Sequence, residues 1–75
     1  MKVTVKLISY LSIQAGFSEK EFEIPSGSTV KALLDRIQLK TPLAKVIIRN
    51  GRSVKPEEKL EKGDRIVISP VFSGG

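Results

Sequence analysis

Residues 24–34 read Ile-Pro-Ser-Gly-Ser-Thr-Val-Lys-Ala-Leu-Leu, and this stretch decides the fold. Pro25 cannot donate a hydrogen bond to a β-ladder, so it ends the strand that precedes it. The Pro-Ser-Gly-Ser segment at 25–28 is typical of a turn, and Ser28 or Thr29 then offers a side-chain oxygen that caps a helix. The stretch therefore predicts a strand, a turn and the beginning of a helix.

The helix is supported by one apolar stripe. Apolar residues recur at i, i+3, i+4 and i+7, which is the spacing of an amphipathic helix, at Val30, Leu33, Leu34 and Ile37. We expect the helix to end at Leu39, because Pro42 biases Thr41 away from helical backbone angles. The pattern of the whole chain supports one helix.

Before this stretch, two segments alternate with the period of a half-buried strand. Residues 2–8 place Val3, Val5 and Leu7 on one face and polar residues on the other. Residues 9–17 are irregular, and residues 18–24 resume the alternation. The sequence therefore predicts a first and a second strand joined by an irregular connection.

After the helix, the residues predict a hairpin and a last strand. Residues 46–49 form a strand, Asn50-Gly51 is the strongest short hairpin signal, and residues 52–54 return. Residues 56–60 predict a loop or a single helical turn. A Gly-Asp turn at 63–64 then leads into a strand at 65–69, in which Ile66 and Ile68 point inward.

This order of elements predicts an α+β fold of the β-grasp (ubiquitin-like) type. A mixed sheet of four or five strands would carry one helix on one face, with the first and last strands side by side at its centre. At 75 residues the chain has room for one domain, which we place at residues 1–69. Residues 70–75 are expected to form a flexible C-terminal tail that ends in Gly-Gly.

Composition excludes several kinds of chemistry. The chain has no Cys and no His, which rules out thiolate or Cys/His metal sites, cysteine nucleophiles and histidine-dependent catalysis. No apolar run exceeds three residues, against the ~20 that a membrane helix needs, and the first residues do not form a signal peptide. We therefore expect a cytoplasmic protein that does not contact a membrane and holds no metal.

The formal charge of +5 is concentrated in one segment. Between Arg36 and Pro56 the chain has no acidic residue and carries the basic residues Arg36, Lys40, Lys45, Arg49, Arg52 and Lys55. Such a cluster is either a solvated face or a docking surface for an acidic partner, with Arg49 and Arg52 as its candidate contacts. Nucleic-acid binding is disfavoured, because the chain has one Tyr, three Phe and no Trp for base stacking.

The element order and several short motifs together resemble the ThiS/MoaD group of ubiquitin-like sulfur carriers. The motifs are residues 24–34, Asn50-Gly51, residues 63–66 and the terminal Ser73-Gly74-Gly75, and the resemblance covers almost the whole chain. It implies that the protein is a co-substrate or a small non-catalytic subunit of a sulfur-transfer enzyme. No catalytic residue is expected in the chain itself.

The resemblance also implies a mechanism for Gly75. A partner related to ubiquitin-activating enzymes would use ATP to adenylate the Gly75 carboxylate, and a persulfide would then replace the AMP to leave a thiocarboxylate. The chain itself would bind no cofactor. Residues that thread the tail into a partner would be Pro70, Val71, Phe72, Ser73 and Gly74. Glycine suits a narrow channel, because it has no Cβ.

The sulfur acceptor is left open between several pathways. A proline-containing tail that ends in Ser-Gly-Gly resembles the molybdopterin branch, in which the acceptor would be the large subunit of molybdopterin synthase. The tail departs from that branch, because Ser69 rather than an aromatic residue precedes Pro70, and Phe72 rather than Val precedes Ser73. Thiazole synthase in thiamine synthesis, tRNA thiolation and a protein-modifier role stay open. A ubiquitin-like interaction module with an inert tail is the alternative from another class.

Apolar residues opposite the core predict a second docking surface. If the inward positions face the helix, then Ile8, Val67 and either Ile47 or Ile48 lie near the solvent face. Alternation with Lys45 and Arg49 would turn Ile47 outward, whereas resemblance to ubiquitin turns Ile48 outward, and we favour Ile48. Three apolar residues on neighbouring strands would form a patch of the kind that binds protein.

Overall fold

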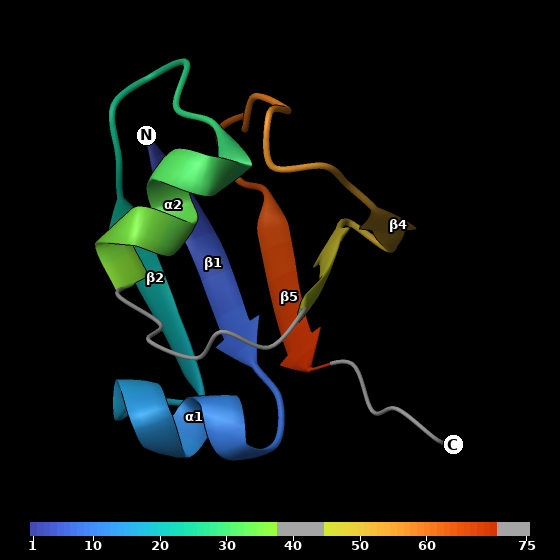
Figure 1. The fold of residues 1–75 in the computed structure, drawn as a ribbon. Helices are drawn as coiled ribbons and strands as arrows, with labels where there is room; N and C mark the ends of the chain where they lie inside the picture. The colour runs from blue at the N-terminus through green and yellow to red at the C-terminus, as the bar shows by residue number, and fades with distance from the viewer. Residues whose placement is uncertain (38–44, 71–75) are drawn as a thin grey trace.

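The first and last strands lie side by side at the centre of a five-stranded sheet (Figure 1). The computed structural model describes residues 1–37 and 45–70. Its strands are β1 (Lys2–Leu7), β2 (Glu19–Glu23), β3 (Lys45–Arg49), β4 (Arg52–Ser53) and β5 (Arg65–Pro70). Their order is β2-β1-β5-β3-β4, with β1 and β5 parallel and the other neighbours antiparallel. The predicted β-grasp fold is confirmed.

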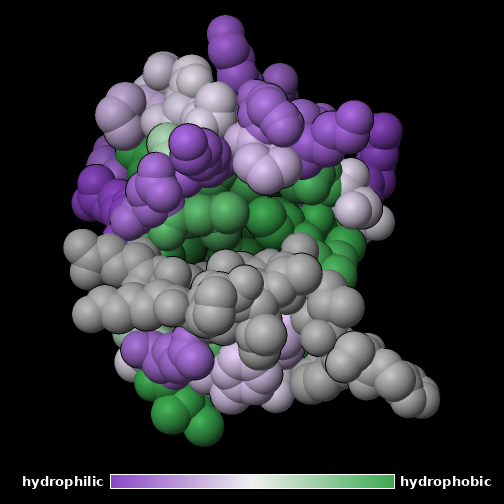
Figure 2. All heavy atoms as spheres, viewed as in Figure 1, coloured by the Kyte–Doolittle hydropathy of each residue, from purple (hydrophilic) through white to green (hydrophobic). Residues whose placement is uncertain are grey.

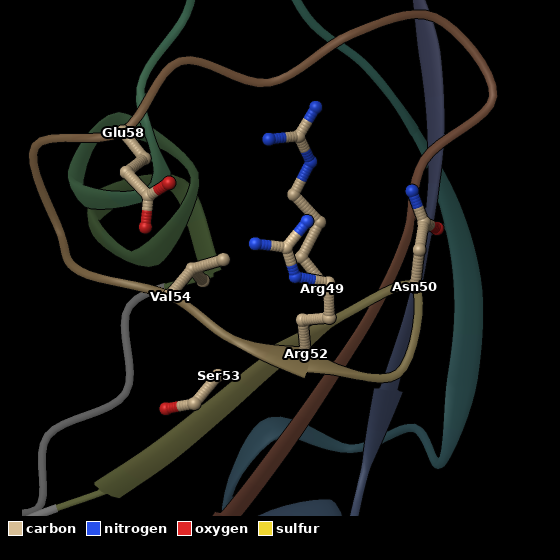
Figure 3. Close-up of a pocket in the computed structure, with 6 residues that line it drawn as sticks. All are labelled: Arg49, Asn50, Arg52, Ser53, Val54 and Glu58. Carbon is tan, nitrogen blue, oxygen red and sulfur yellow. The ribbon is translucent and has the colours of Figure 1, made fainter.

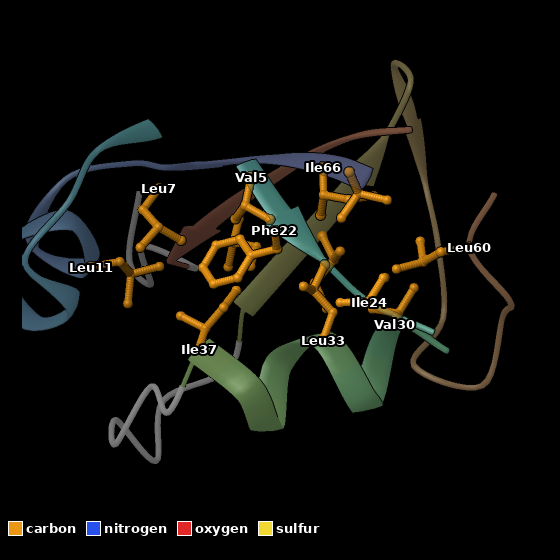
Figure 4. Packing of buried hydrophobic residues seen from close by; sticks show 13 residues of the cluster. Val5, Leu7, Leu11, Phe22, Ile24, Val30, Leu33, Ile37, Leu60 and Ile66 are labelled. Atoms are coloured by element: carbon orange, nitrogen blue, oxygen red, sulfur yellow. The ribbon is translucent and has the colours of Figure 1, made fainter. Parts of the chain in front are cut away.

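Helix α2 (Val30–Ile37) covers one face of the sheet, as the apolar stripe predicts. Of the two possible caps, Thr29 is the one that binds, because the Ala32 N–H donates to its Oγ1 over 3.2 Å. The predicted helix end at Leu39 lies outside the described residues. Figure 4 shows the buried side chains that fill the space between α2 and the sheet. Leu33, Ile66 and Ile68 among them are fully buried.

A second helix, α1 (Tyr10–Ala15), occupies the segment that the sequence predicts to be irregular. Leu11 anchors it, because its side chain is fully buried in the core, whereas the Ile13 side chain is 82% exposed. Gly16, with φ of 83°, ends the helix in the left-handed conformation, and its N–H donates to the Ser12 carbonyl over 3.0 Å. The prediction of a single helix is therefore wrong. A helix of six residues is too short to show an apolar stripe in the sequence. No helix in residues 1–37 and 45–70 is long and apolar enough to span a membrane.

The β3–β4 hairpin turns at Asn50-Gly51, as predicted. Both residues have positive φ, 49° and 85°, which the two-residue turn requires and which Asn and Gly tolerate best. Ile48 pairs with Ser53 and Arg49 with Arg52 on either side of the turn. The hairpin therefore fixes the register of the sheet's β4 edge.

Candidate functional site

β5 carries the chain to the predicted tail from the middle of the sheet. It pairs with β1 on one side and with β3 on the other, so the residues before the tail are held on both edges. Pro70 was assigned to the tail by its sequence, but it is the buried last residue of β5 and lies opposite Lys45. A proline fits there, because a strand's end makes the least use of its missing N–H. Val71, Phe72, Ser73, Gly74 and Gly75 lie outside the described residues, so their roles stay predictions.

The face of the sheet away from α2 carries an apolar patch beside β5. Cross-strand register places Ile48 next to Val67 and Val46 next to Ser69. Ile8 lies on the other side of β5, where its N–H donates to the Ile68 carbonyl over 3.0 Å. We call the four apolar residues on this face the outer patch: Ile8, Val46, Ile48 and Val67.

The register decides which isoleucine of β3 belongs to the outer patch. Ile47 is buried in the core, whereas Ile48 is half-buried and faces away from α2, as favoured from the sequence. Val46 is a member that the sequence analysis missed, and it is 38% exposed. Side chains alternate between the two faces of a strand, so a buried Ile47 places Val46 on the same outer face as Ile48. This alternation would have identified Val46 from the sequence.

The other half of the same face is charged. Lys6 lies opposite Glu19 and Thr4 opposite Glu21 on β1 and β2, with Arg65 beside Thr4 on β5. The Arg65 guanidinium pairs with the Glu19 carboxylate at 3.2 Å. The apolar surface of this face is thus centred on β5 and β3, with Ile8 at the end of β1, and it is suited to a desolvated contact with another protein.

Arg49 and Asp64 form a polar network at the opposite end of β5. Asp64 is only 4% exposed, and its Oδ2 accepts hydrogen bonds from Arg49 Nε and from the Glu61 N–H, both at 2.7 Å. Its Oδ1 accepts a bond from Asn50 Nδ2 over 3.0 Å. Asn50 is held in turn by Arg65, whose N–H donates to Asn50 Oδ1 over 2.9 Å. The network ties the hairpin to the beginning of β5.

The charge state of Asp64 follows from these contacts. Burial by itself would raise the pKa of Asp64, but the bonds from Glu61, Asn50 and Arg49, together with the Arg49 charge, outweigh it and lower that pKa below 3.8. Asp64 is therefore ionised at neutral pH and compensates the charge of Arg49.

This network changes the roles expected of Arg49 and Asn50. Arg49 was predicted as a partner-binding surface residue, but its side chain is 21% exposed and is paired within the chain. Asn50 is more than a turn residue, because its side chain bridges Asp64 and Arg65. Sequence spacing did not reveal this, since Asp64 and Asn50 meet only when β3 and β5 are neighbours. Arg52 is exposed, as expected of a surface cation.

The described residues do not assemble a metal centre: within 1–37 and 45–70, no three His, Cys, Asp or Glu side chains gather in a way that could hold an ion. What the described residues do present is an apolar patch around the central strand β5. Exposed apolar patches are typical of surfaces that bind another protein.

Comparison with known proteins identifies one matching family. The model of the ThiS family matches residues 5–75, which is nearly the whole chain. No curated protein matches the chain in sequence.

Solved structures with the same fold include proteins of two kinds. A putative molybdopterin converting factor, subunit 1, from Pyrococcus furiosus is 28% identical, with a TM-score of 0.85, covering 96% of this chain and 99% of that one. Small archaeal modifier protein 1 from Methanosarcina acetivorans is 26% identical, with a TM-score of 0.76 and coverage of 99% and 96%. A chain from a complex of subunits 1 and 2 of molybdopterin-converting factor from Helicobacter pylori is 22% identical, with a TM-score of 0.72, covering 100% of this chain and 100% of that one.

Proposed function

This chain belongs to the ThiS family, and on that premise we propose that it is a cytoplasmic sulfur carrier that works through the carboxylate of Gly75. The observation that carries the proposal is that the family match runs through Gly74 and Gly75. The chain would be a co-substrate, and the catalytic groups would belong to its partners. Its composition agrees, because it offers neither the thiol nor the imidazole that such chemistry would need.

The proposed reaction begins with activation, because an ionised carboxylate is a poor electrophile. A partner of the ubiquitin-activating type joins the Gly75 carboxylate to the AMP part of ATP and releases pyrophosphate. The terminal sulfur of a persulfide then attacks the acyl carbon and AMP leaves, which gives an acyl persulfide. A thiol cleaves the S–S bond of that intermediate, becomes part of a disulfide and leaves the thiocarboxylate on Gly75.

The outer patch supports a docking step in this reaction. Val67 lies on β5 and Ile48 lies beside it on β3, so a partner seated on the patch is close to the end of β5. Five residues follow Pro70, and once extended in a partner's channel they would reach at most ~18 Å. The patch would thus hold the carrier while Phe72, Ser73 and Gly74 thread toward the active site.

For the sulfur acceptor we propose the large subunit of a molybdopterin synthase. Similarity to the Pyrococcus furiosus converting-factor subunit supports this choice over thiazole synthase or tRNA thiolation. The Helicobacter pylori complex adds that a protein of this fold is found with a second subunit.

A second candidate function is protein modification, in which the activated Gly75 is joined to a lysine. The similarity to the Methanosarcina acetivorans modifier protein favours it. Both candidates share the adenylation step and differ only in what attacks the activated carbonyl.

Pyrophosphate exchange into ATP tests the step that both candidates share. With a cognate adenylating enzyme, the full chain should stimulate exchange and the chain lacking Gly75 should not, although both should bind the enzyme through the outer patch. Gly74→Val should also block exchange, because a β-branched side chain would not fit a channel shaped for glycine. Binding by both chains without exchange by either would favour the interaction module.

A further inference from the structure

A cleft of about 230 Å³ opens between the β3–β4 hairpin and the segment that leads from β4 toward β5 (Figure 3). Its lining residues are Arg49, Asn50, Arg52, Ser53, Val54 and Glu58. The hydrophilic residues in Figure 2 gather around the loops at this end of the molecule. Because Arg49 alternates in register with the buried Ile47, the cleft lies on the α2 side of the sheet, away from the outer patch.

Two arginines are placed opposite each other in this cleft. Arg49 and Arg52 are direct cross-strand partners on either side of the turn. Figure 3 shows both side chains rising from the hairpin into the cleft. Like charges directly opposite each other on neighbouring strands are unfavourable, so this position needs a negative charge nearby.

Among the described residues, ion pairs within the chain involve Arg49 but not Arg52. Arg49 has Asp64 at 2.7 Å and Glu61 at 3.8 Å. Within residues 1–37 and 45–70, Arg52 forms no ion pair, and its guanidinium keeps a full set of donors for an oxyanion. The Nη groups of Arg49 add donors at the same place, since Asp64 is bound through Nε.

Glu58 forms the opposite wall of the cleft. Its carboxylate faces the cleft in Figure 3, and its Oε2 accepts a hydrogen bond from the Lys55 N–H over 2.8 Å. That bond holds Glu58 beside the arginines without placing it within ion-pair distance of Arg52. An incoming carboxylate would compete with Glu58 for the same positive field.

We propose that this cleft is an oxyanion subsite that receives one Asp or Glu side chain of a partner protein. Its volume lies below the ~300 Å³ at which small-molecule pockets begin, so it suits a side-chain group better than a nucleotide. The net charge of +5 draws acidic protein surfaces toward the chain. The subsite goes beyond the sulfur-carrier function, because it involves neither Gly75 nor the outer patch.

Titration of the full chain with acetyl-Gly-Glu-Glu-Gly-amide, followed by ¹H–¹⁵N NMR, tests the proposal. The backbone amides of Arg52 and Ser53 and the Nε–H of Arg49 should shift, and the Gln-Gln version of the peptide should leave them unmoved. Arg52→Gln should weaken binding about five- to tenfold, because a charged hydrogen-bonding group is lost. Arg36→Gln is the matched control, since it removes the same charge from an exposed position on α2.

Two further variants make the test specific. Glu58→Gln should tighten peptide binding, because it removes the competing carboxylate. Arg52→Lys keeps the charge but loses the planar guanidinium, so it should also weaken peptide binding. This variant tests the subsite even if Arg52→Gln disturbs the fold.

Several outcomes would overturn the subsite. Equal weakening by Arg36→Gln and Arg52→Gln would reduce it to general charge attraction. Equal binding of the Gln-Gln peptide, or no shift with either peptide, would remove it. Binding of inorganic phosphate at Arg52 without binding of the Glu-Glu peptide would assign the cleft to a free phosphate instead.

Discussion

Arg49 donates through Nε to Oδ2 of Asp64 over 2.7 Å. Because Asp64 immediately precedes β5, this bond joins the end of β3 to the beginning of β5. The two residues are fifteen positions apart in the chain. The carboxylate is almost completely buried, while the guanidinium is partly exposed. Because Asp64 also accepts bonds from Glu61 and Asn50, one carboxylate fixes the hairpin, the preceding loop and the central strand together.

Replacing Asp64 should destabilise the fold strongly. Asp64→Ala leaves three donors without an acceptor and one arginine without its counterion, so we expect a loss of about 3 kcal/mol in the free energy of unfolding. Glu61→Gln is the matched control, because the Glu61 side chain is 81% exposed and only 3.8 Å from Arg49, and it should cost less than about 1 kcal/mol. Urea denaturation measures both. Similar losses for the two variants would contradict the assigned role of Asp64.

The same carboxylate should make stability depend on pH in the acid range. The pKa of Asp64 is lower in the folded chain than its ordinary value of 3.8, so the unfolded chain binds the proton more tightly. The stabilisation by Asp64 is therefore fully present above about pH 5 and is lost as the pH falls through the lowered pKa. Unfolding free energies of the parent and Asp64→Asn, measured from pH 6 to pH 2, should converge as the pH falls. Parallel curves would show that Asp64 contributes nothing by its charge.

The fold was predictable where local pattern and tertiary burial agree. The buried face of β1 follows from the alternation of Val3, Val5 and Leu7 in the sequence. The buried face of α2 follows from the helical spacing of Val30, Leu33 and Ile37. The turn at Asn50-Gly51 was predictable, because its backbone angles select those residue types.

Helix α1 and the Asp64 network were not predictable, because tertiary contacts specify them. Leu11 is the one fully buried residue of α1, with Tyr10 and Ala15 partly buried against the core, and a single buried position shows no period. Asp64 becomes a hydrogen-bond centre only because β5 lies next to β3, a neighbour relation that local sequence does not encode. The internal ion pair of Arg49 was not predictable for the same reason, and its role in partner binding stays a prediction.

Two residues of α1 test the helix that the sequence did not predict. Leu11→Ala should cost about 2–5 kcal/mol, because the Leu11 side chain is fully buried. Ile13→Ala, in the same helix, should change stability by less than about 0.5 kcal/mol, because the Ile13 side chain is 82% exposed. Denaturant midpoints of the two variants give the comparison. Equal costs would mean that α1 does not pack through Leu11.

The outer patch should be required for docking to the adenylating enzyme. Val67→Asp should weaken binding at least about tenfold without unfolding the chain, because it puts a charge into a contact that must lose its water. Ile13→Asp makes a matched change at an exposed apolar residue of α1 that is not a member of the patch, and it should leave affinity unchanged. Calorimetric titration of both variants decides the assignment. If Val67→Asp binds as tightly as the parent, another face of the molecule makes the contact.

The sulfur-carrier mechanism is tested by the intact mass of the chain after incubation with its adenylating enzyme, ATP, a persulfide donor and a thiol. We expect a mass gain equal to the exchange of one oxygen for sulfur, located at Gly75 by fragmentation and absent when Gly75 is deleted. Deletion should leave the denaturation midpoint unchanged, so that loss of the mass gain reports on chemistry rather than folding. Persistence of the mass gain without Gly75, or its location elsewhere in the chain, would contradict the carrier mechanism.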